Sequence, residues 1–118
     1  MNVLNGLIEE IQVSGELSIV RSRVGSVLFS AILIDTPESL PSLKVGEPTR
    51  VVFKETEVII ATDEVVGISL RNRLPGNVKS IESDALLSKL ELETEVGTIN
   101  SIITAQAVKQ LGIKKGME

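Results

Sequence analysis

The 118-residue chain is rich in aliphatic residues, with 42% hydrophobic and 2% aromatic residues, and its 12 Lys+Arg against 16 Asp+Glu give a net charge of −4. Because it has neither cysteine nor histidine, disulfides, thiolate metal sites and catalysis by a histidine base are excluded, and we expect no enzymatic activity. The acidic balance argues against nucleic-acid binding by this chain itself. Without about 18 consecutive apolar residues or a secretory signal, we expect a cytoplasmic protein that does not contact a membrane.

Short runs of Val, Ile and Leu predict strands in the first part of the chain. The first strand is expected over residues 6–13, before a turn at Ser14-Gly15. The second is expected over residues 17–22 and the third over residues 26–34. The third run is apolar on both faces, which predicts a central position in its sheet.

Residues 36–41 begin like a helix, with Thr36 as the expected N-cap. Pro41 limits this helix to about one turn. We expect Leu40 and Leu43 to point inward from this turn.

Two further short strands are expected over residues 49–55 and 56–61. Later in the chain, Thr104 is the expected N-cap of a helix over residues 105–111. Gly112 supplies the stop signal of that helix.

An offset of 70 residues aligns residues 4–48 with residues 74–118 without a gap. The identical pairs at matching places are glycines, apolar or small residues and one lysine: Leu4/Leu74, Gly6/Gly76, Ile11/Ile81, Leu17/Leu87, Ser18/Ser88, Ile32/Ile102, Lys44/Lys114 and Gly46/Gly116. The competing interpretation is a chance match between two aliphatic strand patterns. From the offset we predict two tandem β-rich modules, over residues 1–64 and 65–118. We expect the C-terminal module to be incomplete at its end, so that a missing tail or another chain would complete it.

Three stretches resemble the molybdate-binding module of molbindins, also called the TOBE domain. Residues 69–76, Ser-Leu-Arg-Asn-Arg-Leu-Pro-Gly, resemble the family's opening Ser-Ala-Arg-Asn-x-Leu-x-Gly. Residues 98–106 resemble its central strand and helix cap, and residues 51–60 resemble its final strand pair. The fold that we expect is mainly β: two small OB-like β-barrel modules, each with one short helical turn.

The resemblance implies non-catalytic binding of molybdate or tungstate at interfaces between modules. The role would be molybdenum storage and homeostasis, or ligand sensing in a regulator, in a homo-oligomer that is a dimer or a trimer. A dianion that is bound without catalysis needs hydroxyl, guanidinium and ammonium donors. By resemblance, the oxyanion-binding residues are Ser69, Arg71, Asn72, Lys54 and Thr104.

Each of these residues has a structural alternative. Ser69 and Arg71 can belong to an exposed linker, Lys54 can be a solvent-facing strand lysine, and Thr104 can serve as an N-cap alone. The first copy lacks the Ser-x-Arg-Asn opening and the second lacks a closing lysine, so we expect the site at the contact between modules. Two other functions stay open: a structural or oligomerisation pair without ligand, and an accessory domain of an oxyanion transporter ATPase.

Overall fold

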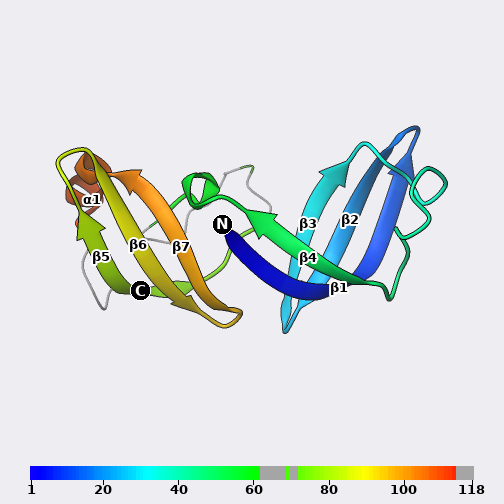
Figure 1. Ribbon diagram of the computed structural model, residues 1–118, viewed down its shortest axis with the longest axis horizontal. Helices are drawn as coiled ribbons and strands as arrows, with labels where there is room; N and C mark the ends of the chain where they lie inside the picture. The colour runs from blue at the N-terminus through cyan, green and yellow to red at the C-terminus, as the bar shows by residue number, and fades with distance from the viewer. Residues whose placement is uncertain (62–68, 70–71, 114–118) are drawn as a thin grey trace. The chain divides into compact units, whose positions relative to one another are not determined.

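The computed structural model describes residues 1–61, 69 and 72–113, which form two compact units (Figure 1). We call Val3–Val51 the N-terminal unit, and Val52–Glu118 together with Met1–Asn2 the C-terminal unit. The predicted boundary between residues 64 and 65 lies outside the described residues.

A four-stranded sheet with the order β3-β2-β1-β4 builds the N-terminal unit. Its strands are β1 (Asn2–Ser14), β2 (Leu17–Val24), β3 (Val27–Leu33) and β4 (Pro48–Phe53), and the pairs β1–β2 and β2–β3 are antiparallel. The predicted strands are confirmed, but the central position predicted for the third is wrong, because β3 lies at the edge of the sheet. One of its faces stays open, where Ile32 is 73% exposed.

The core of the N-terminal unit is a cluster of Ile8, Val20 and Leu43, with Ile11 and Leu33 packed against it. Leu43 reaches the core from the turn after β3, where the Leu40 N–H donates to the Thr36 carbonyl at 2.8 Å. The predicted single turn is therefore confirmed. Leu43 points inward as expected, whereas Leu40 is 39% exposed.

The C-terminal unit contains an antiparallel sheet with the order β5-β6-β7, formed by β5 (Gly76–Ser83), β6 (Leu87–Thr94) and β7 (Gly97–Thr104). Helix α1 (Ala105–Leu111) follows, with Thr104 as its N-cap and Gly112 as its C-cap at a φ of 67°. This positive φ suits glycine because a side chain would be strained there. The predicted helix and both of its end signals are confirmed.

The strand predicted over residues 56–61 is wrong. A 3-10 helix, η1 (Glu55–Glu57), begins there, and no regular element follows it up to residue 61. The Lys54 N–H donates to the Glu57 carboxylate at 2.7 Å, and the Glu57 N–H donates to the Lys54 carbonyl at 3.0 Å. These local bonds hold the tight turn in place of an extended chain. Within the described residues the strands form open sheets, so the closed OB-like barrel that we expected is not observed.

The two units build their cores from residues that are 70 positions apart. The C-terminal cluster consists of Val78, Leu90 and Ile113, which follow Ile8, Val20 and Leu43 of the other cluster at that offset. The register irregularity between Ile8 and Glu10 in the first sheet likewise has its counterpart between Val78 and Ser80 in the second.

The open edge of β7 is covered by residues from elsewhere in the C-terminal unit. The Asn2 side-chain amide donates to the Asn100 carbonyl at 2.8 Å, and its carbonyl oxygen accepts from the Asn100 N–H at 2.8 Å. The Ser101 hydroxyl donates to the Val58 carbonyl at 2.9 Å. Asn2 is 3% exposed, so one buried side chain takes the place of a neighbouring strand residue at a sheet edge.

We predict that Asn2→Ala lowers the free energy of unfolding by about 1–3 kcal/mol, because it leaves the N–H and C=O of Asn100 without partners. Chemical denaturation measures the loss. Asn5→Ala is the matched control, since Asn5 is an exposed asparagine of the same strand. Equal stability of the two variants would contradict the edge-covering role of Asn2.

Candidate functional site

The structure places Lys54 and Thr104 in the C-terminal unit, where both side chains are exposed. Lys54 is the N-cap of η1, and Thr104 is the N-cap of α1. Ser69 and Asn72 are exposed, and Arg71 lies outside the described residues. Two of the five predicted donors therefore sit in defined local structure.

The Thr104 hydroxyl oxygen accepts from the Ala107 N–H at 3.0 Å. This bond confirms the helix-capping role that the sequence predicted. Capping uses the oxygen as an acceptor, and a threonine hydroxyl also has a proton to donate. A second role as a donor to an anion is therefore chemically compatible with the cap.

No hydrogen bond or ion pair joins Lys54 to Thr104 in the described part of the chain. The segments that carry them are nevertheless linked, because Ser101 of β7 donates its hydroxyl proton to the Val58 carbonyl beyond η1. Lys54 lies shortly before Val58 and Thr104 shortly after Ser101, so this bond links the segments that carry the two residues within one unit.

Two positive groups act on the Glu55 carboxylate of η1. The Glu55 carboxylate forms an ion pair with the amino group of Met1. The pKa of Glu55 lies below its ordinary value, chiefly because the Met1 amino group hydrogen-bonds the carboxylate, with a smaller contribution from the charge of Lys89. We call Met1, Glu55 and Lys89 the Glu55 cluster. Sequence reasoning missed this cluster, because Met1 and Lys89 are distant from Glu55 in the chain.

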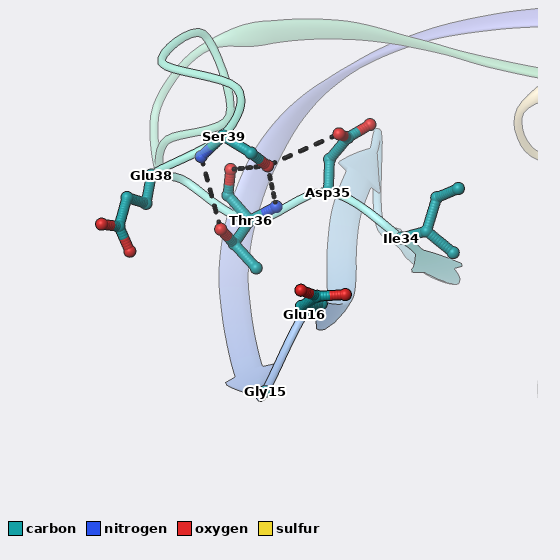
Figure 2. Close-up of a pocket in the computed structure, with 7 residues that line it drawn as sticks. All are labelled: Gly15, Glu16, Ile34, Asp35, Thr36, Glu38 and Ser39. Atoms are coloured by element: carbon teal, nitrogen blue, oxygen red, sulfur yellow. Dashed lines mark hydrogen bonds between the residues drawn. The ribbon is translucent and has the colours of Figure 1, made fainter.

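A shallow pocket of about 340 Å³ lies in the N-terminal unit, between the turn after β1 and the segment after β3 (Figure 2). Its lining residues are Gly15, Glu16, Ile34, Asp35, Thr36, Glu38 and Ser39. The Thr36 hydroxyl accepts from the Ser39 N–H at 3.4 Å, and the Ser39 hydroxyl accepts from the Thr36 N–H at 2.8 Å. Thr36 therefore caps its turn as Thr104 caps α1.

The negative charge of the residues that line this pocket is unfavourable for binding an anion. Three of its lining residues are acids and none is basic, so a bound oxyanion would need positive charge from residues outside the lining. The Ser39 hydroxyl already donates to the Thr36 carbonyl at 3.2 Å, so Thr36 alone of the two has a hydroxyl proton to offer. Sequence reasoning recognised Thr36 as a cap but missed Ser39. The spacing in the sequence could have indicated this contact, because Ser39 follows Thr36 as Ala107 follows Thr104, and in both pairs the later residue's N–H donates to the threonine hydroxyl.

Comparison with known proteins agrees with the described fold. A TOBE domain is matched over residues 68–118. A crystal structure of the cytoplasmic molybdate-binding protein ModG, with molybdate bound, is 30% identical with a TM-score of 0.89. The similarity covers 98% of this chain and 84% of the ModG chain. The chain therefore belongs to the ModG family.

Two negative findings accompany these matches. No curated protein sequence matches the chain significantly. Among the described residues, no helix has the length and apolar character required to cross a membrane.

We predict that Thr104→Ala destabilises the protein by about 1 kcal/mol through loss of the helix cap, while Thr104→Ser retains most of the stability. Chemical denaturation without ligand measures both effects, and hydrogen exchange of residues 105–111 locates them. A Thr104→Ala variant with unchanged stability and unchanged exchange in α1 would show that the cap contributes nothing.

Proposed function

We propose that this chain binds molybdate or tungstate without catalysis, in molybdenum storage and homeostasis or in ligand sensing. The observation that carries the proposal is the similarity to molybdate-bound ModG over 98% of the chain. The composition agrees with it, since the absence of histidine and cysteine leaves hydroxyl, guanidinium, ammonium and backbone donors, which are suited to an oxyanion. ModG is a cytoplasmic protein, and we propose the same location here.

The proposed architecture is a tandem pair of one module, over residues 1–64 and 65–118. It is supported by the two cores, which use residues 70 positions apart, and by β2 and β6, whose first residues, Leu17 and Leu87, are separated by the same 70 positions. A module of this size buries a modest share of its surface and gains from a neighbour. We propose oxyanion sites where modules meet, in a homo-oligomer that is a dimer or a trimer.

The proposed donors are Ser69, Arg71, Asn72, Lys54 and Thr104. Arg71 and Lys54 supply the positive charge, because the hydroxyls alone cannot neutralise a dianion. The role of Asn72 has a structural competitor. Asn2, which precedes it by 70 positions, uses its amide to pair with a strand edge.

Calorimetric titration with molybdate tests this function. Ligand at 100 times its Kd should stabilise the folded protein by about 2.7 kcal/mol. Arg71→Ala and Lys54→Ala should each weaken binding about tenfold or more, since each removes a charge-assisted hydrogen bond. Arg50→Ala, at an exposed arginine of β4, is the control and should bind as the wild type does.

Two results would contradict the proposal in different ways. Absence of heat and of thermal stabilisation with molybdate and tungstate would favour the structural or oligomerisation role. Binding that survives both Arg71→Ala and Lys54→Ala unchanged would retain the function and reject the site.

A further inference from the structure

Ser101 carries a buried hydroxyl in β7 that is bonded to a segment outside its own sheet. Its side chain is 0% exposed, and its hydroxyl donates to the carbonyl of Val58, the residue that ends η1. A buried hydroxyl needs such a partner, because leaving it unpaired costs more free energy than the bond itself contributes. This bond therefore fastens the end of η1 to β7.

Lys54 and Val58 are the two ends of one hydrogen-bonded turn, as N-cap and C-cap of η1. The Glu57 N–H donates to the Lys54 carbonyl at 3.0 Å, and the Lys54 N–H donates to the Glu57 carboxylate at 2.7 Å. Because these bonds close the turn, a fixed carbonyl at Val58 also restricts the backbone of Lys54.

A second connection joins the same turn to the neighbouring residue of β7. The Met1 amino group pairs with the Glu55 carboxylate of η1. The next residue, Asn2, exchanges two hydrogen bonds with the backbone of Asn100. Asn100 is the residue before Ser101, so both connections to η1 meet at one place on β7.

We propose that Ser101 is a positioning residue for oxyanion binding, which acts on Lys54 through η1. The inference rests on the proposed function and deepens it, because it assigns a role to a residue that does not touch the ligand. The Lys54 ammonium ends a long flexible side chain, and binding has to immobilise it. A backbone that is already fixed at Lys54 reduces the conformational entropy lost on binding and so increases the affinity.

The repeat indicates that the Ser101 hydroxyl can be removed without loss of the fold. The corresponding residue 70 positions earlier is Ala31 of β3. Ala31 lies opposite Val20, as Ser101 lies opposite Leu90. An alanine is therefore compatible with this place in the sheet, and Ser101→Ala should fold.

Calorimetric titration with sodium molybdate compares the wild type with Ser101→Ala, Lys54→Ala and the double variant. Loss of one neutral hydrogen bond should weaken binding about three- to tenfold in Ser101→Ala. In the Lys54→Ala background the same change should weaken binding less than about twofold, because Ser101 acts only through Lys54. Ser101→Thr retains the hydroxyl and should bind as the wild type does.

The matched control is Ser88→Ala. Ser88 is also 0% exposed, and its hydroxyl bonds the Ser83 hydroxyl at 2.7 Å, between β6 and β5 and away from η1. Loss of this bond should lower the melting temperature and leave the molybdate affinity unchanged. The control thereby separates a general loss of stability from a loss of positioning.

The outcomes distinguish this inference from the function on which it rests. If Ser101→Ala binds as the wild type does, or weakens binding equally with and without the Lys54 ammonium, the positioning role is overturned and the proposed function is kept. Absence of molybdate binding by the wild type overturns both.

The remaining outcomes also decide the role of Ser101. If Lys54→Ala binds too weakly to be measured, weaker binding by Ser88→Ala or by Ser101→Thr overturns the positioning role, and wild-type binding by both supports it. Thermal melting without ligand checks the fold. Loss of the folded state in Ser101→Ala would assign the hydroxyl to stability and overturn the positioning role.

Discussion

The pairing of the Asn2 side chain with the backbone of Asn100 is the contact on which the arrangement of the C-terminal unit depends. Among the described strands β7 ends its sheet, so the backbone groups on its outer side need partners that none of these strands supplies. Asn2 meets this need with one donor and one acceptor. The same contact holds Met1 where its amino group pairs with Glu55, beside Lys54. The sheet edge thereby fixes the position of the ion pair between Met1 and Glu55.

Sequence reasoning succeeded where the signal was local. α1 begins after Thr104 and ends before Gly112 as predicted, because capping depends on a few neighbouring residues. The strand prediction over residues 56–61 failed. The hydrogen bond from the Lys54 N–H to the Glu57 carboxylate favours a tight turn there, and it outweighs the strand propensity of the aliphatic residues that follow. Sequence reasoning also misplaced β3, because an apolar pattern on both faces does not show whether another strand lies beside it.

The donors were predicted by resemblance, and their surroundings were not. Lys54 and Thr104 could be assigned because each lies in a recognisable stretch of sequence, whereas the Glu55 cluster forms from residues that are distant in the chain. The 70-residue offset was more informative than its few identities suggested, since it pairs the buried residues of both cores. In small aliphatic modules the positions that pack together carry the pattern, and those positions can be read from the sequence.

We propose that this chain binds a molybdate-type oxyanion with donors that include Lys54 and Thr104. X-ray diffraction at the molybdenum absorption edge, from crystals grown with molybdate, tests it most directly. We expect an anomalous peak with molybdate oxygens within about 3.2 Å of the Lys54 ammonium or the Thr104 hydroxyl. A map without a peak, or with molybdenum remote from every proposed donor, would contradict it.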